Sequence, residues 1–141
     1  TGFGLQANYT IVRGDIGFDV NANPGESQFA LLGLSDTANL IGIYEKDGWT
    51  ARVAFNWRDE YLAGFGQNQN TGAYGAEPTF VNQSFQVDLT SSYDVTKDFS
   101  IFGEILNLNN NKQSTHGRFK NQLLDVFDYG RRFTLGARYR F

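Results

Sequence analysis

Residue types that commonly perform catalysis are scarce in this chain of 141 residues, which contains one histidine, His116, and no cysteine. His116 lies close in sequence to Ser114 and Asp125, so a serine nucleophile with a histidine base can be drawn. Such an arrangement needs rigid orientation and an oxyanion site, and the surrounding residues carry no motif for one. The better interpretation of His116 is a solvated loop residue. We therefore expect no catalytic residue and no enzymatic activity.

Metal-binding chemistry also lacks ligands. Without cysteine the chain has no disulfide and no cysteine-ligated zinc or iron-sulfur site, and one histidine does not make a histidine-rich metal site. The segment from Arg13 to Asp36 contains Asp15, Asp19 and Glu26, which could attract Ca²⁺ or a cationic ligand. Their spacing is not that of an EF-hand, and scattered acidic residues are usually solvated. We predict no metal and no cofactor.

The residues best suited to binding a small molecule are amides and aromatic rings between Ala63 and Thr79. Sugars stack on aromatic faces and form hydrogen bonds with amides, so an oligosaccharide is one candidate substrate. A polar surface loop is the simpler interpretation of the same residues. The asparagine-rich stretch 107–111 is interpreted first as turn chemistry and second as a sugar-binding surface. Two arginines join the ligand-binding candidates, which are Phe65, Gln67, Asn68, Asn70, Tyr74, Arg52 and Arg58.

Charge and hydropathy exclude two classes of protein. The net charge of −3 and the isoelectric point near 5.0 do not suit a nucleic-acid binder, which needs a basic surface. No apolar run approaches the roughly 18 residues of a membrane-spanning helix. The chain begins at Thr1 without an initiator methionine or a signal segment, so we expect it to be processed or part of something longer.

The elements that must position these residues are β-strands, because apolar residues alternate with polar ones along most of the chain. Phe3 to Ile11 and Trp49 to Trp57 show this period of two most clearly, and the final apolar residues reach Phe141. No internal repeat or linker divides the chain, so a single segment, 1–141, is expected. The six predicted strands lie near residues 3–11, 38–45, 49–58, 85–94, 99–108 and 132–141.

Two tight turns join predicted strands. Asp47-Gly48 is a strong two-residue hairpin signal, and pairing Lys46 with Trp49 places Tyr44, Gly42 and Leu40 opposite Ala51, Val53 and Phe55. The same register places Asn39 opposite Asn56 on the polar face. The second turn, 95–98, brings Tyr93 and Phe99 onto one face if a bulge is allowed, and its simplest register sets Asp88 against Glu104.

The remaining connections are long, roughly Arg13 to Asp36, Ala63 to Thr79 and Asn109 to Asp128. Short turns at one end of antiparallel strands and long loops at the other describe a bacterial outer-membrane barrel. Six strands are too few to close one, because the smallest single-chain type has about eight. We therefore expect missing strands or partner chains to cover both edges of the sheet.

Aromatic residues fall near the strand ends, where outer-membrane barrels place their interface girdles. The face opposite the apolar one carries charges such as Arg52, Asp88 and Arg138, which suit a water-filled lumen. The alternative is a soluble sandwich whose aromatic rings pack a core. The predicted girdle is Tyr44, Trp49, Trp57, Tyr61, Tyr93 and Phe99.

The sequence resembles the C-terminal part of a TonB-dependent outer-membrane receptor over essentially its whole length. The resemblance is carried by 44–49 (YEKDGW), 51–62 (ARVAFNWRDEYL), 104–108 (EILNL) and 130–141 (GRRFTLGARYRF). It implies the last six transmembrane strands of a 22-stranded, all-β antiparallel barrel, in the cell outer membrane, with the N-terminal plug and earlier strands absent. Its ending resembles the signal read by the barrel assembly machinery, assigned to Phe133, Leu135, Tyr139 and Phe141.

The resemblance also implies a function: TonB-coupled uptake of a bulky nutrient, either an oligosaccharide or a ferric siderophore. This segment would contribute barrel wall, lumen surface and extracellular loops. Its expected partners are outer-membrane lipid, the missing plug and strands, the TonB complex through those missing parts, and the assembly machinery. Two alternatives stay open: a passive porin-like barrel built from short chains, and a soluble ligand-binding β-barrel.

Overall fold

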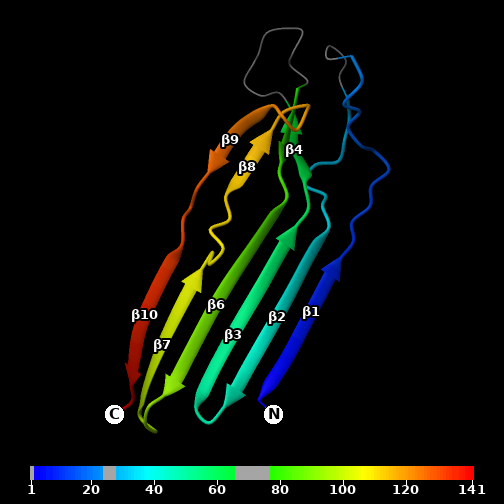
Figure 1. Cartoon of the computed structure of the whole chain (residues 1–141). Helices are drawn as coiled ribbons and strands as arrows, with labels where there is room; N and C mark the ends of the chain where they lie inside the picture. Colours follow the sequence, from blue (N-terminus) through cyan, green and yellow to red (C-terminus); the bar gives the residue numbers. More distant parts are fainter. Residues whose placement is uncertain (1, 24–27, 66–76) are drawn as a thin grey trace.

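A computed structural model describes residues 2–23, 28–65 and 77–141 (Figure 1). The described residues form ten β-strands in two antiparallel sheets and no helix. Accordingly, no helix in these ranges is long and apolar enough to cross a membrane. The larger sheet has the strand order β1-β2-β3-β6-β7-β10. Its members are β1 (Phe3–Thr10), β2 (Thr37–Lys46), β3 (Trp49–Arg58), β6 (Ser84–Asp94), β7 (Phe99–Leu106) and β10 (Arg132–Tyr139).

The six strands of the larger sheet are those that the alternating pattern predicts. The register between β2 and β3 is also confirmed, with Lys46 opposite Trp49 and Asn39 opposite Asn56. The turn explains this agreement, because Asp47 and Gly48 both adopt positive φ angles, 53° and 78°. A two-residue hairpin with both φ angles positive leaves no freedom to shift the pairing.

The predicted register between β6 and β7 is wrong. Thr90, not Asp88, lies opposite Glu104, and Tyr93 pairs with Ile101 without a bulge. The turn 95–98 is tightened by Thr96, whose backbone N–H donates to Phe99 O and whose Oγ1 accepts from the backbone N–H groups of Asp98 and Phe99. This closure moves the pairing by two residues, which preserves the two faces and removes the expected contact between like charges.

The connection from Asn109 to Asp128 is not a simple loop, and here the prediction is wrong, because it contains two strands. The described ends of the connection from Ala63 to Thr79 also belong to strands, and its residues 66–76 lie outside the described residues. A smaller sheet of order β4-β5-β8-β9 contains β4 (Tyr61–Phe65), β5 (Pro78–Val81), β8 (Gln113–His116) and β9 (Leu123–Phe127). Each of these strands directly follows or precedes one strand of the larger sheet. In Figure 1 the smaller sheet continues the larger one on the side away from the short turns. Each strand of the smaller sheet therefore extends a strand of the larger one: β4 and β5 extend β3 and β6, and β8 and β9 extend β7 and β10, with a break between the two sheets.

Most of the buried residues among those described lie at the smaller sheet. Leu62, Val81, Pro78 and His116 are buried there. The segment after β1 packs against it: Phe18 contacts the rings of Phe65 and Phe80 at 5.6 and 6.1 Å between centroids. The all-β antiparallel class is thus established. The larger sheet is open among the described residues, with β1 and β10 as its unpaired edges.

Candidate functional site

One face of the larger sheet consists of apolar side chains, and no other described part of the chain packs against it. Direct cross-strand pairs place Val53 beside Leu89 and Leu89 beside Ile105 on this face. Exposure is greatest near the sheet edges, where Leu5 is 75% and Leu135 is 87% exposed. A soluble monomer rarely exposes a continuous apolar surface of this kind.

Aromatic rings border the apolar face at both ends of the strands. Near the short turns each of the six strands supplies one ring. The centroid of the Tyr44 ring lies 4.8 Å from that of Phe3 and 5.5 Å from that of Trp49. The complete row is Phe3, Tyr44, Trp49, Tyr93, Phe99 and Tyr139. At the other end Trp57 stacks on Tyr9 at 6.5 Å and pairs with Phe85. Two aromatic rows therefore enclose an apolar band.

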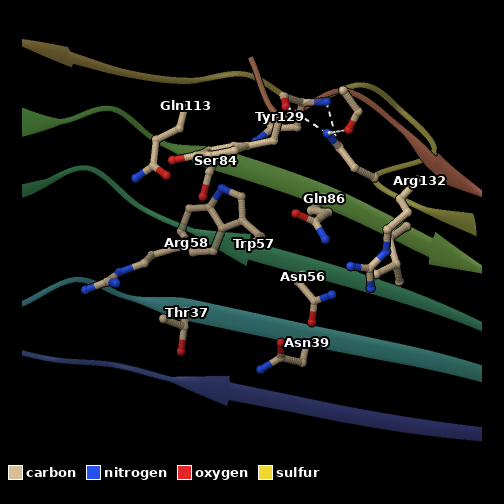
Figure 2. Close-up of a pocket in the computed structure, with 14 residues that line it drawn as sticks. Thr37, Asn39, Asn56, Trp57, Arg58, Ser84, Gln86, Gln113, Tyr129 and Arg132 are labelled. Carbon is tan, nitrogen blue, oxygen red and sulfur yellow. Dashed lines mark hydrogen bonds between the residues drawn. The ribbon is translucent and has the colours of Figure 1, made fainter. Parts of the chain in front are cut away.

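The opposite face carries a row of four amide side chains at one level of the sheet. Asn8 lies opposite Asn39, Asn39 opposite Asn56, and Asn56 opposite Gln86. We call these four residues the amide row. Three of them line an open cleft of about 640 Å³, in which Figure 2 shows Asn39, Asn56 and Gln86 side by side on neighbouring strands.

The next level toward the smaller sheet contains hydroxyl groups and one arginine. Thr37 lies opposite Arg58, and Arg58 opposite Ser84. The Arg58 guanidinium is already engaged: it donates to Ser35 Oγ at 2.8 Å and to Gly33 O at 3.0 Å. It also lies over the Tyr61 ring, 3.8 Å from the centroid. Arg58 therefore braces the segment before β2.

Two other charged residues of this face, Asp88 and Arg132, contact neighbouring side chains or backbone groups. Asp88 Oδ1 accepts from Gln86 Nε2 at 2.8 Å and from the Asn107 backbone N–H at 2.9 Å. Arg132 Nη2 lies 3.7 Å from Glu104 Oε1. Arg52 is exposed and forms no ion pair with a described residue, and the same holds for Arg138 on this face. Arg52 shares a smaller hollow with Asp88 and Glu104, so acidic groups surround it.

An asparagine-rich bulge between β7 and β8 forms one wall of the cleft. Asn107 and Asn110 have positive φ angles of 57° and 53°, which asparagine tolerates better than most residues. Asn107 Nδ2 donates to Asn111 O at 3.0 Å and to Gly130 O at 2.9 Å, and Asn107 Oδ1 accepts from the Asn111 N–H at 2.7 Å. Asn109 bonds the β6 backbone at Phe85 and Val87. The prediction of turn chemistry is confirmed.

Tyr129 stands at the rim of this cleft. Its side chain is 74% exposed, and its ring stacks on Phe127 with 6.3 Å between centroids and 13° between planes. Figure 2 shows Tyr129 on the same side of the sheet as the amides. It leads into the turn before β10, where the Gly130 N–H donates to Asp128 Oδ1 at 3.0 Å.

The interpretation of His116 as a solvated loop residue is wrong. His116 is 3% exposed, lies in β8 and stacks on Phe80 at 5.2 Å. Nδ1 lies 2.7 Å from Gly117 O, and Nε2 lies 3.2 Å from Glu60 Oε2 at ion-pair distance but without an aligned hydrogen bond. Ser114 Oγ instead accepts from Asn82. Since Asp125 contacts Thr115, the structure does not assemble the serine nucleophile arrangement.

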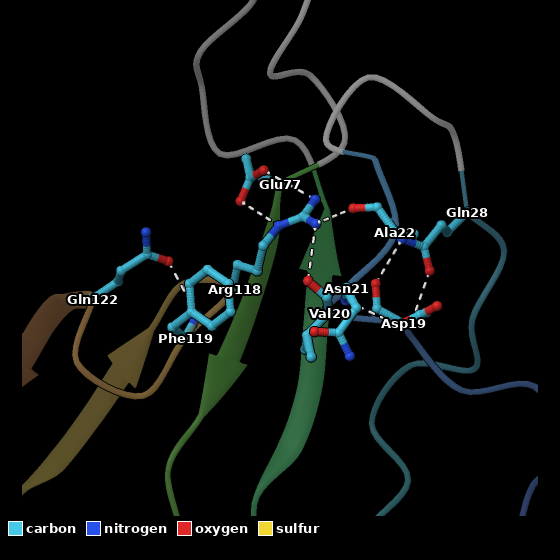
Figure 3. A network of polar contacts seen from close by, with 9 residues as sticks. All are labelled: Asp19, Val20, Asn21, Ala22, Gln28, Glu77, Arg118, Phe119 and Gln122. Atoms are coloured by element: carbon cyan, nitrogen blue, oxygen red, sulfur yellow. Dashed lines mark hydrogen bonds and ion pairs between the residues drawn. The ribbon is translucent and has the colours of Figure 1, made fainter.

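Arg118 connects three segments that are far apart in sequence (Figure 3). It is 7% exposed, and its Nη1 donates to Val20 O at 3.1 Å and to Ala22 O at 2.7 Å. Its Nη2 lies 3.1 Å from Glu77 Oε1. The segment after β1 is therefore held by Arg118, which follows β8 and also pairs with Glu77 just before β5.

Two carboxyl groups outside the larger sheet have lowered pKa values. The pKa of Asp36 lies below its ordinary value because the Val12 backbone N–H donates to it and Arg13 lies 3.0 Å away. The pKa of Asp128 is lowered by the Lys112 ammonium at 2.7 Å and by the Gly130 N–H. Both groups hold connections beside the cleft in their ionised form.

Several sequence-predicted site residues lie away from the cleft. Phe65 packs against Phe18 at the end of β4, and Tyr61 lies in β4 beneath Arg58. Of the predicted assembly residues, Phe133, Leu135 and Tyr139 lie on the apolar face of β10, and Phe141 follows it. The remaining ligand-binding candidates fall outside the described residues: Gln67, Asn68, Asn70 and Tyr74.

Sequence reasoning missed the cleft because it searched the loops for amides and aromatic rings. The signal was present in the strands, where the register of the β2-β3 hairpin already placed Asn39 opposite Asn56. Extending that row to Asn8 and Gln86 requires the registers of β1 and β6, which no tight turn specifies.

Comparison with known proteins identifies no relative: no family model, no curated protein and no solved structure matches this chain.

Proposed function

We propose that this chain forms part of the wall of an outer-membrane β-barrel, with its apolar face against lipid and its polar face toward a water-filled interior. The observation that carries the proposal is the uncovered apolar face between two aromatic rows. From Trp49 to Trp57 the strand rises about 27 Å, which at a tilt of 35–45° corresponds to roughly 20 Å across the bilayer. This height is close to the ~25 Å apolar band of such barrels.

Exposure of the apolar face to water would be energetically unfavourable. Each fully buried Leu, Ile, Val or Phe side chain contributes about 1.5–3 kcal/mol relative to an exposed one, so leaving this face in water would forgo many such contributions. Lipid can supply that burial without a partner protein. Lipid also requires every backbone group of the sheet to be bonded, so the edges at β1 and β10 need neighbouring strands.

Within this class we propose TonB-coupled uptake of a bulky nutrient, the function that the resemblance to TonB-dependent receptors implies. The long hairpins that continue beyond the larger sheet suit this role, because they form a packed structure above the wall. A plug, further strands and the TonB complex would then be partners of this segment. Uptake that stops when the TonB complex is deleted supports this proposal, whereas undiminished uptake would support a passive porin-like barrel instead.

The orientation is tested by placing one arginine on either face of β10. Leu135 and Thr134 are neighbours that face opposite sides of the sheet. Leu135→Arg should reduce the free energy of folding into vesicles by about 2–4 kcal/mol if Leu135 contacts lipid. Thr134→Arg, the matched control, should change it little because Thr134 lies opposite Glu104 on the polar face. Equal effects of the two substitutions, or recovery of the protein in the aqueous phase, would contradict the proposal.

A further inference from the structure

The amide row is unusual because most of its hydrogen-bonding capacity is unused. Gln86 donates to Asp88, but the side chains of Asn8, Asn39 and Asn56 form no hydrogen bond with a described residue. Each amide offers two N–H donors and one carbonyl acceptor. Three neighbouring amides with free donors and acceptors on one level of a sheet therefore form a surface suited to a ligand that both donates and accepts.

The spacing of the row sets the shape of such a ligand. Adjacent strands lie about 4.8 Å apart, so four opposed residues extend over roughly 14 Å. One inter-strand interval is close to the length of one hexose unit in an extended chain. A polyhydroxylated polymer lying across the strands would meet one amide at each sugar, with hydroxyl groups of Thr37 and Ser84 on the next level.

The charges around the cleft favour a neutral ligand over an anionic one. Arg58 is held by Ser35 and Gly33, and Arg132 lies beside Glu104. The unpaired Arg52 shares its hollow with two carboxylates, Asp88 and Glu104. Among the described residues that line the cleft only two are arginines, the held Arg58 and the mostly exposed Arg132, which lies 3.7 Å from a carboxylate. An anionic ferric siderophore would need a larger positive cluster, whereas a neutral sugar requires none.

An aromatic platform completes the site. The exposed Tyr129 ring stands at the rim of the cleft and stacks on Phe127. An exposed ring at this position suits stacking against the apolar face of a sugar, while its hydroxyl supplies a further hydrogen bond.

We propose that the amide row together with Tyr129 is a binding site for a neutral, extended oligosaccharide. The proposal rests on the proposed function, because the row faces the barrel interior only if the apolar face contacts lipid. Asn39 and Asn56 form the centre of the site, Asn8 and Gln86 extend it along the row, and Tyr129 stacks against one sugar. The site lies below the two hairpins, on the wall itself.

The test is calorimetric titration of the full-length, detergent-solubilised protein that carries this chain. The probes are cellohexaose, which is neutral, and hexagalacturonate, which has the same number of sugar units and is anionic. We expect cellohexaose to bind at least tenfold more tightly. The Asn39→Ala/Asn56→Ala double variant should weaken cellohexaose binding by about tenfold or more, since each lost hydrogen bond contributes on the order of a two- to tenfold change.

Two variants complete the design. Tyr129→Ala should weaken cellohexaose binding by a similar factor, whereas Gln6→Ala, an amide on the same face beside Ile41 and Ala54, should change it less than threefold. No cellohexaose binding, tighter hexagalacturonate binding, or equal effects of Gln6→Ala and the double variant would overturn the inference. If one of these results is found and the parent protein still folds into the membrane, only the assignment of the binding site fails. If the parent protein is instead recovered in the aqueous phase, the proposed function itself fails.

Discussion

The side chain of Asn107 should stabilise the junction between the two sheets more than any neighbouring asparagine. It is 7% exposed and forms three side-chain hydrogen bonds, two from Nδ2 and one to Oδ1. At about 1 kcal/mol each these bonds contribute roughly 3 kcal/mol. Its φ of 57° adds about 1 kcal/mol to the cost of an alanine there. Asn107→Ala should therefore lower the free energy of unfolding by about 4 kcal/mol.

Two further variants separate the backbone contribution from the side-chain contribution. Asn107→Gly loses the same three bonds but tolerates a positive φ, so its cost should be about 3 kcal/mol. Asn110 also has a positive φ, 53°, and its side chain forms no hydrogen bond with a described residue. Asn110→Ala should therefore cost only about 1 kcal/mol.

The assay is guanidinium unfolding in phospholipid vesicles, followed by the fluorescence of Trp49 and Trp57. The expected order of destabilisation is Asn107→Ala, then Asn107→Gly, then Asn110→Ala. If Asn107→Ala and Asn110→Ala destabilise equally, the hydrogen bonds of Asn107 contribute nothing, and the explanation of the junction is refuted.

Three other outcomes are expected. Arg118→Ala should raise the rate of amide hydrogen exchange of residues 19–22 about tenfold, because the hydrogen bonds from Arg118 to Val20 O and Ala22 O are lost. Arg118→Lys should give a rate between those of Arg118→Ala and the parent. An unchanged exchange rate would contradict the role of Arg118 in holding this segment. Asp36→Asn should be less stable than the parent at pH 7, and the difference should shrink as the pH falls below the ordinary pKa of aspartate. Because the pKa of Asp36 is lowered in the folded state, its carboxylate stabilises the fold at pH values above the ordinary pKa of about 3.9, and this stabilisation is lost as the pH falls through the lowered pKa. A difference in thermal midpoint between variant and parent that does not change with pH would argue against this role of Asp36. Phe141→Ala should slow assembly into the outer membrane in pulse-chase experiments while leaving refolding in detergent unchanged, and equal slowing of both would count against an assembly signal.

The sequence specified the larger sheet because two independent signals agreed there. Alternation fixed which residues share a face, and the Asp47-Gly48 turn fixed the pairing of β2 with β3. The turn 95–98 offered no such geometry, since its closure depends on Thr96, and the predicted register was therefore two residues out. Both faces were still assigned correctly, because a shift of two preserves them.

The smaller sheet escaped prediction for a different reason. Its strands have four or five residues and include polar members such as Ser114 and His116, so no period of two stands out. His116 is buried because Phe80 covers its ring and Glu60 approaches it, which are contacts between distant segments. Its burial follows from tertiary packing and not from its local sequence.

The facing of the larger sheet is the central claim, and cysteine labelling tests it most directly because the chain has no cysteine of its own. Single cysteines at Arg52 and Asn56 on one face, and at Val53 and Phe55 on the other, place matched probes on one strand. In membranes, cysteines at 52 and 56 should react with a charged maleimide at least tenfold faster than cysteines at 53 and 55. Fluorophores attached at 53 and 55 should be quenched only by a lipid-soluble quencher. Equal reaction at all four positions, or the reverse pattern, would contradict the account.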